Sequence, residues 1–171
     1  GNYTEPYLVS KIIIRSTGEV IENENETKRI ISPETAYMIT DVLKGVVNWR
    51  MRSYKYKITD NFAAKTGTTN YPSNTWDRYP GLAGDAVSDC WVMGYTNKTV
   101  VSIWYGYKEL DKDHLDRVLH WVPAGNQRAE LFNAVANAVF NHDGTDFEQP
   151  KSVLKIGVEA GTNPPLLPST N

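Results

Sequence analysis

The stretch that decides the fold is Phe62-Ala63-Ala64-Lys65-Thr66-Gly67-Thr68-Thr69-Asn70. An apolar lead-in followed by these polar residues is typical of a strand that faces a substrate. Because side chains alternate along a strand, Lys65 and Gly67 point to one face and Thr66 and Thr68 to the other. Gly67 permits close approach of another backbone. Lys65 supplies a positive charge, and the neighbouring backbone N–H groups can stabilise a developing oxyanion.

The bulk properties are those of an ordinary soluble globular protein. The 171 residues suit one domain or a substantial part of one, and the net charge of −2 does not favour nucleic-acid binding. Cys90 is the only cysteine, which excludes an internal disulfide and a cysteine-based zinc site. No run reaches the roughly 18 apolar residues of a membrane helix. The chain begins without methionine, so we interpret it as a processed or trimmed piece.

Before the deciding stretch, the sequence predicts a hairpin and a helix. Residues 7–15 and 20–22 are strand-like and are separated by the turn Ser16-Thr17-Gly18-Glu19. Ser32-Pro33-Glu34 is a helix start, with Ser32 as N-cap. The residues expected to face inward on this helix are Ala36, Ile39, Leu43 and either Val46 or Val47.

After the deciding stretch, the sequence predicts a loop from Tyr71 to about Ser88, two strands and a helix. The strands cover residues 90–96 and 99–107 and join at Asn97-Lys98. The helix spans about 126–140, with its inward face formed by Leu131, Val135, Ala138 and Val139. Together these elements predict an α+β fold, with helices covering a mainly antiparallel sheet.

Several stretches follow one another in a specific order: Glu5-Pro6-Tyr7, Ser10-Lys11-Ile12, 18–21, 32–38, 43–47, Ala64–Asn70, 89–96 and 101–107. In this order they resemble the transpeptidase domain of class A penicillin-binding proteins, and the resemblance runs from Glu5 to Phe140. It implies part of the β-lactamase/transpeptidase-like fold. Residues 1–148 would be the C-terminal portion of the domain, and residues 149–171 a weakly structured tail or linker.

The resemblance also implies a function. Such proteins are bacterial cell-wall synthases in which a glycosyltransferase domain precedes the transpeptidase domain. A serine attacks the D-Ala-D-Ala end of a peptidoglycan stem peptide, and the acyl group passes to an amine of a neighbouring stem. β-Lactams imitate D-Ala-D-Ala and leave the serine acylated. We therefore expect a location at the extracytoplasmic face of the cell membrane, with an anchor outside this chain. We expect no cofactor, no metal and no nucleic-acid partner.

Residue roles follow from the same resemblance, in which Lys65-Thr66-Gly67 is the family's K-T-G motif. Lys65 would bind the carboxylate of the substrate or antibiotic and shape the proton network around the nucleophile. Thr66 and Thr68 would offer hydroxyls to that carboxylate, and the N–H of Thr68 would form half of the oxyanion hole. The peptide would lie along the strand edge, where Gly67, Thr69 and Asn70 complete the substrate-binding residues.

The family's other two motifs, S-x-x-K and S-x-N, do not occur before Lys65. Ser152-Val153-Leu154-Lys155 and Ser169-Thr170-Asn171 fit the patterns, but both follow K-T-G. We interpret them as coincidences, because the S-x-x-K serine opens a buried helix that desolvates its lysine. The chain alone should not acylate. The missing N-terminal part of the domain should supply the nucleophile, and it is either a separate chain left by proteolysis or a part absent from this piece. Without that part, the core face of its helices would be exposed, which predicts a partner or poor solubility.

Three departures from the family pattern stand out. Ala64 replaces a usual glycine, and residues 48–56 lack a Gly-Thr-Gly-like turn. The 71–88 loop is longer than usual and carries Trp76, Tyr79 and Gly81. It is either a lid or substrate contact, or an inert surface insertion.

Rival functions fit less well. A phosphate-binding loop is excluded because no glycine is followed by lysine. A metal site at Asp111, Asp113, His114 and Asp116 matches no EF-hand order, and a solvated acidic helix start is favoured. The remaining alternative is a catalytically silent penicillin-fold module that binds cell-wall peptides or division proteins.

Overall fold

The computed structural model describes residues 1–49, 51, 54 and 58–167. The chain forms two compact units. Unit 1 comprises Gly1–Met38 and Gln149–Asn171, and unit 2 comprises Ile39–Glu148. Among the described residues, no helix is both long and apolar enough to cross a membrane.

Unit 1 contains two pairs of short antiparallel strands. β1 (Asn2–Thr4) pairs with β4 (Thr27–Arg29), and β2 (Lys11–Ile13) pairs with β3 (Val20–Glu22). The β2–β3 pair confirms the predicted hairpin, although β2 is shorter than the 7–15 run. Gly18 has a φ of 76° in the connecting turn, a conformation that glycine adopts without steric cost. The β1–β4 pair was not predicted.

Helix α1 (Pro33–Trp49) begins as the sequence predicts. The Ser32 hydroxyl accepts the N–H of Thr35 at 3.1 Å, which satisfies one of the unpaired donors of the first turn. Val47 is buried, and Val46 packs against the core. The prediction for Ile39 was wrong, because its side chain is 52% exposed.

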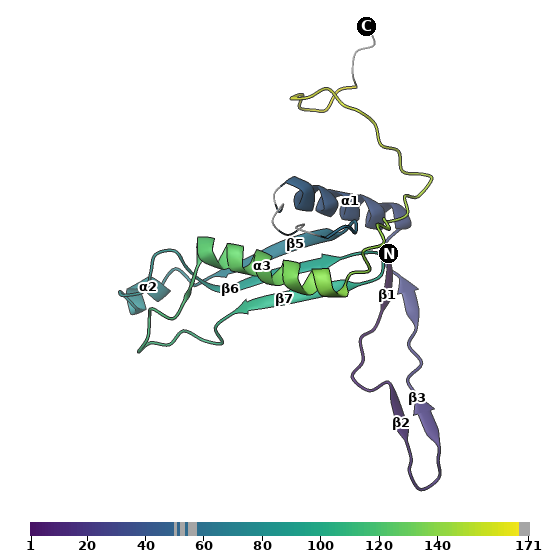
Figure 1. The fold of residues 1–171 in the computed structure, drawn as a ribbon, viewed down its shortest axis with the longest axis horizontal. Coiled ribbons are helices and arrows are strands. Elements are labelled where there is room, and N and C mark those ends of the chain that lie inside the picture. The colour runs from purple at the N-terminus through teal and green to yellow at the C-terminus, as the bar shows by residue number, and fades with distance from the viewer. Residues whose placement is uncertain (50, 52–53, 55–57, 168–171) are drawn as a thin grey trace. The chain divides into compact units, whose positions relative to one another are not determined.

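The centre of unit 2 is an antiparallel sheet in the order β5-β6-β7 (Figure 1). Its strands are β5 (Ala63–Asn70), β6 (Ala86–Tyr95) and β7 (Val100–Gly106). This confirms the three adjacent antiparallel strands and the α+β class. At the predicted turn, the Thr96 hydroxyl accepts the N–H groups of Lys98 and Thr99. A short β8 (Leu119–His120), which was not predicted, pairs with the start of β6.

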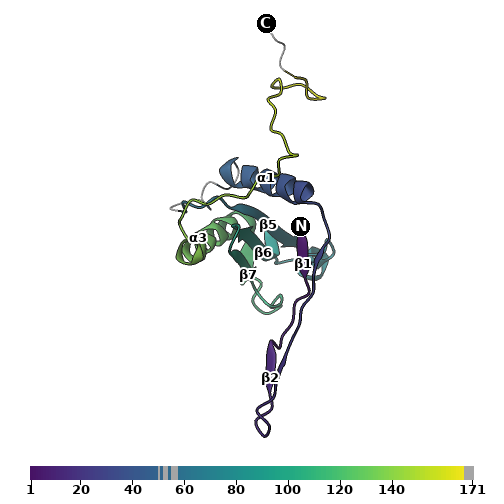
Figure 2. The same cartoon turned by 90° about the vertical axis from the view of Figure 1, so that its right-hand side faces the viewer.

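Helix α3 (Trp121–Val139) lies along the sheet, as Figures 1 and 2 show. It starts five residues before the predicted helix, because Pro123 falls within the first turn, where proline is tolerated. The predicted inward face was wrong for Leu131, Ala138 and Val139, which are exposed, whereas Val135 packs against the core as predicted. The buried residues are Ala124, Arg128, Ala129, Phe132 and Ala136.

The main core of unit 2 lies between this sheet and helices α1 and α3. Phe132 is completely buried, and its ring packs against those of Tyr54 and Phe62, each with a centroid separation of 5.8 Å. Val47 of α1 and Val92 of β6 belong to the same cluster. The core therefore holds α3 against the face of the sheet that includes Val92.

The buried carboxylate of Asp60 joins the segment before β5 to the segment after α3. It accepts the backbone N–H groups of His142, Asp143 and Gly144, at 2.8, 3.1 and 3.3 Å. Asp60 precedes β5, and the three donors follow α3, so one side chain joins the entry of the strand to the exit of the helix. Buried polar groups are paired in this way because an unpaired one is costly.

Candidate active site

All six predicted site residues lie on β5, the strand at one edge of the described sheet. The strand forms because Phe62, Ala63 and Ala64 are buried and anchor its start in the core. From Lys65 onward the side chains are half-buried or exposed. Among the described residues β5 pairs only with β6, so one side of its backbone has no neighbouring strand.

The two faces of β5 have different surroundings. The hydroxyl of Thr68 bonds to Arg128 of α3, so Thr68, and by alternation Thr66, are on the helix-covered face. Gly67 is opposite Trp91, and a Cβ at Gly67 would lie 3.4 Å from that of Trp91. Lys65 shares this second face, where Trp91 is 46% exposed. The alternation predicted for the strand is present.

Lys65 is exposed, and its Nζ donates to the carbonyl oxygen of Thr66 at 2.8 Å. The ammonium therefore lies against the backbone of its own motif. An exposed ammonium that bonds to a neutral carbonyl can exchange this contact for a carboxylate, which is the stronger acceptor.

Arg128 supports the motif from α3, and sequence reasoning did not identify it. Its Nε donates to the hydroxyl of Tyr54 at 2.9 Å. Its Nη1 donates to the carbonyl oxygen of Gly67 at 2.9 Å and to the hydroxyl oxygen of Thr68 at 3.1 Å. An arginine at helical spacing between Ala124 and Phe132 is the signal that could have revealed it.

The end of β5 carries an irregularity in the sheet. The register shifts between Thr69 and Asn70, so that Ser88 of β6 is the extra residue. The Ser88 hydroxyl lies 3.1 Å from the Thr69 carbonyl oxygen and 2.9 Å from a carboxylate oxygen of Asp89, and it can donate to only one at a time. The other Asp89 oxygen accepts the indole N–H of Trp104 at 2.7 Å. The carboxylate is thus held beside the strand end.

The segment between β5 and β6 is ordered by a small apolar cluster of its own. It contains α2 (Thr75–Arg78), and the Trp76 indole N–H donates to the Ala83 carbonyl oxygen at 3.1 Å. Leu82, Ala86 and Val118 form the buried centre of this cluster. Burial, with a smaller contribution from the charge of Asp89, raises the pKa of Tyr71.

A cavity of about 420 Å³ lies beside the end of β5. Asn70, Tyr71 and Trp76 line it, together with Asp85 and Trp121. The His120 ring lies 2.9 Å from the Asp85 carboxylate, and this hydrogen bond is the main cause of the lowered pKa of Asp85. Part of the 71–88 loop therefore forms a recess next to the predicted substrate strand.

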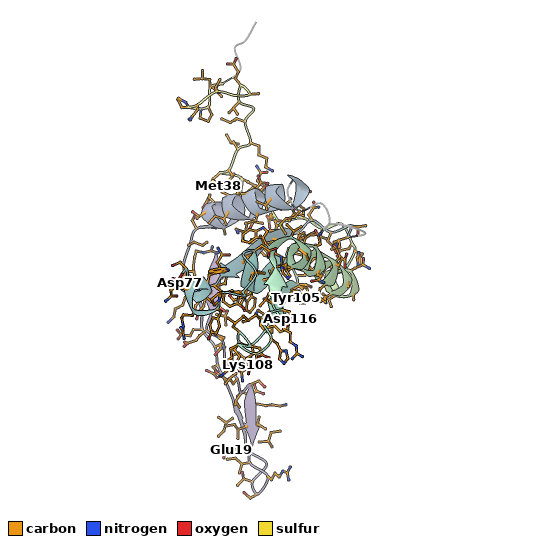
Figure 3. The ribbon with its side chains drawn as sticks, turned by 90° about the vertical axis from the view of Figure 1, so that its left-hand side faces the viewer. Glu19, Met38, Asp77, Tyr105, Lys108 and Asp116 are labelled. Atoms are coloured by element: carbon orange, nitrogen blue, oxygen red, sulfur yellow. The ribbon has the colours of Figure 1, made fainter. Side chains whose placement is uncertain are left out.

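The predicted acidic helix start at residues 111–116 was wrong, because this segment forms turns and α3 begins only at Trp121. Asp111 accepts the N–H of Asp113. Figure 3 labels Asp116 of this segment, and also Lys108, which precedes the segment in the chain. Among the described residues, no group of three or more His, Cys, Asp or Glu side chains could hold a metal ion.

The two late motif matches were interpreted as coincidences. Residues 150–155 contain no helix, and the Ser152 hydroxyl donates to the carboxylate of Glu34 at 2.6 Å. This bond is the main cause of the lowered pKa of Glu34. Ser169-Thr170-Asn171 lies outside the described residues. Of the 48–56 segment without the Gly-Thr-Gly-like turn, residues 50, 52, 53, 55 and 56 also lie outside them.

An edge strand with K-T-G, in an antiparallel sheet covered by helices, is the arrangement that the sequence predicted. The chain belongs to the penicillin-binding protein transpeptidase family, because the family model "Penicillin binding protein transpeptidase domain" matches residues 1–118. This match confirms the predicted resemblance to class A penicillin-binding proteins and the predicted fold class.

Curated relatives cover most or all of the chain. Penicillin-binding protein 1A/1B of Bacillus subtilis (strain 168) is 31% identical over 173 residues, which cover 100% of this chain and 18% of that protein. Penicillin-binding protein 1F of the same organism is 29% identical over 157 residues, or 91% of this chain and 20% of that protein. Penicillin-binding protein 1A of Streptococcus oralis is 33% identical over 107 residues, or 63% of this chain and 17% of that protein. The chain thus spans about a fifth of the length of these relatives.

Proposed function

We propose that this chain forms part of the active site of a bacterial D,D-transpeptidase that cross-links peptidoglycan stem peptides and binds penicillin. The chain supplies the K-T-G strand, and a serine elsewhere in the full-length protein supplies the nucleophile. The observation that carries the proposal is the position of Lys65-Thr66-Gly67 on β5, at the sheet edge of a transpeptidase-family chain.

In the proposed reaction, the serine hydroxyl attacks the carbonyl carbon between the two D-alanines. The carbonyl oxygen becomes an oxyanion, which the N–H of Thr68 stabilises as one of two donors. Lys65 and the hydroxyls of Thr66 and Thr68 bind the terminal carboxylate. The C–N bond then breaks, and the terminal D-alanine leaves with the serine proton on its amine. An amine of a second stem takes the acyl group and releases the serine.

The free side of β5 suits an extended substrate. A peptide lying along this edge would gain main-chain hydrogen bonds as an added strand does. Gly67 adds no side chain there, and Thr69 and Asn70 continue the exposed edge. A β-lactam would use the same contacts through its carboxylate and its lactam carbonyl.

We place this activity at the extracytoplasmic face of a bacterial membrane, with the anchor outside the chain. We also propose that residues 1–148 are the C-terminal portion of the transpeptidase domain, and that the N-terminal portion packs against this chain. Large exposed apolar side chains on the sheet support such a partner, namely those of Trp91, Met93 and Trp104.

The test is acylation of the full-length protein by a fluorescent penicillin. Lys65→Ala should slow acylation by at least about 100-fold, the scale typical of losing one stabilising group in such a site. Lys98→Ala is the matched control, because Lys98 lies between β6 and β7 and pairs with Asp143. Unchanged acylation in Lys65→Ala would contradict the assigned role. Absence of labelling in a folded wild-type protein would instead favour the silent binding module.

A further inference from the structure

Arg128 is the one cationic side chain among the buried residues of the described part of the chain. It is 9% exposed, and a guanidinium in such a position costs free energy unless its contacts compensate. All three of its hydrogen-bond acceptors described above are neutral oxygens. Among the described residues, Arg128 forms no ion pair with a carboxylate. Its positive charge therefore remains directed at the strand.

The two bonds from Nη1 act on adjacent residues of the motif. The carbonyl oxygen of Gly67 and the hydroxyl oxygen of Thr68 share the two hydrogens of one nitrogen. Both bonds reach successive residues of β5 from helix α3.

The bond to Thr68 also decides what its hydroxyl can do. A hydroxyl has one proton to donate and lone pairs that accept. Arg128 occupies a lone pair, so the proton of Thr68 is left for another acceptor. Within the described residues, no acceptor is paired with that proton. The hydroxyl is therefore prepared as a donor with a positive charge behind it, which is the arrangement that an anionic ligand group prefers.

We propose that Arg128 is a positioning residue for carboxylate recognition at the K-T-G strand. It acts through Thr68, by holding that hydroxyl as a donor, and through its uncompensated charge. The ligand class is a peptide or β-lactam with a free carboxylate. This inference rests on the proposed function, which supplies the carboxylate-bearing ligand.

The experiment compares two probes on the full-length protein: benzylpenicillin with its free carboxylate, and benzylpenicillin methyl ester. Arg128→Met should lower the acylation rate constant for the free acid by about 10- to 100-fold, as expected when a bond to a charged group is lost. The rate for the ester should change by less than about 3-fold, so the preference for the acid should collapse. Arg128→Lys keeps the charge and should restore part of that preference.

Two further variants separate positioning from folding. Gln127→Ala is the matched control, because Gln127 neighbours Arg128 on α3 and accepts the hydroxyl proton of Tyr105 at 2.8 Å. Gln127→Ala should leave the acylation rate constants for both probes unchanged. Thr68→Val should remove the preference for the acid. In the double variant Thr68→Val/Arg128→Met, the acylation rate constant for the acid should fall by less than the product of the two single-variant effects, because both substitutions act on one hydroxyl.

The outcomes are distinguishable. If wild-type protein is acylated and Arg128→Met, with an unchanged melting temperature, keeps the full acid preference, this inference is wrong and the proposed function stands. Equal losses for acid and ester would make Arg128 merely structural and overturn the inference as well. If Arg128→Met does not fold, the single variants Arg128→Lys and Thr68→Val replace it. Full retention of the preference for the acid in both would then overturn the inference. If folded wild-type protein is not acylated, the proposed function itself fails.

Discussion

Gly94 shows how a single absent side chain permits the packing behind the motif strand. It pairs with Ala64 across β5 and β6, and a Cβ there would lie 2.4 Å from Cζ and 2.8 Å from Cε2 of Phe132. Phe132 is completely buried among other rings, so it has little room to move. Gly94 therefore allows α3 to pack closely against the sheet. This close packing brings Arg128 of α3 within hydrogen-bond distance of β5.

We expect Gly94→Ala to destabilise the domain by about 1–3 kcal/mol, the usual cost of overpacking a filled core. Denaturant unfolding of the full-length protein, followed at its tryptophans, measures the change. Gly84→Ala is the control, because a Cβ at that position meets no heavy atom within 4 Å. Equal stability of the two variants would mean that the contact between α3 and the sheet relaxes freely.

At the scale of single residues, the sequence predicted that the motif lies on one strand, but it did not predict the arginine that bonds to it. Lys65, Thr66 and Thr68 could be proposed as site residues because their types and spacing carry the signal on one strand. Arg128 could not, because its contacts join α3 to β5 across 60 and 61 positions of the sequence. A charged residue on a helix is usually solvated, and only the packed structure shows this one to be buried.

At the scale of elements, hydrophobic periodicity predicted strands better than helix faces. The 90–107 hairpin was identified because β-branched and aromatic runs flank a short polar turn. The predicted inward face of α3 was wrong at Leu131 and Val139, because these residues fit a helical stripe as well as Phe132 and Ala136 do. Packing against Gly94 selects Phe132, and the pattern of apolar residues alone does not contain that partner.

The link between the β6–β7 turn and the segment after α3 depends on pH. Lys98 bonds to the carboxylate of Asp143 at 2.6 Å, and the Thr145 hydroxyl donates to it at 2.7 Å. These bonds, with that of Lys98 first, hold the pKa of Asp143 well below its usual value. A carboxyl whose folded pKa is lowered stabilises the folded state above its unfolded pKa, near 4, and loses that contribution as pH falls toward the folded pKa.

We therefore expect Lys98→Ala to raise the pKa of Asp143 toward the ordinary value, with part of the lowering retained through Thr145. The carboxyl carbon shift of Asp143, followed by NMR during acid titration, measures this pKa. The difference in the pKa of Asp143 between wild type and variant should become smaller at high salt, because the side chains of Lys98 and Asp143 are both partly exposed. An unchanged pKa in the variant would assign the lowering to Thr145 instead.

At the scale of the whole molecule, the chain has no S-x-x-K motif before K-T-G, and we propose that it forms one side of an acyl-transfer site. The family match and the edge position of β5 both favour a site completed by other residues. Sequence order alone was sufficient for the family, because the landmarks from Glu5 to Phe140 form an ordered set. The division into two units was not predicted, since residues 149–171 group with the first 38 residues only in space.

We propose that this chain supplies the carboxylate-binding strand, while the nucleophile lies elsewhere in the full-length protein. The most direct measurement is peptide mapping by mass spectrometry after reaction of that protein with benzylpenicillin. We predict one acyl adduct, on a serine outside residues 1–171, and loss of this adduct in Lys65→Ala. An adduct on Ser152, or complete absence of an adduct from folded wild-type protein, would contradict the claim.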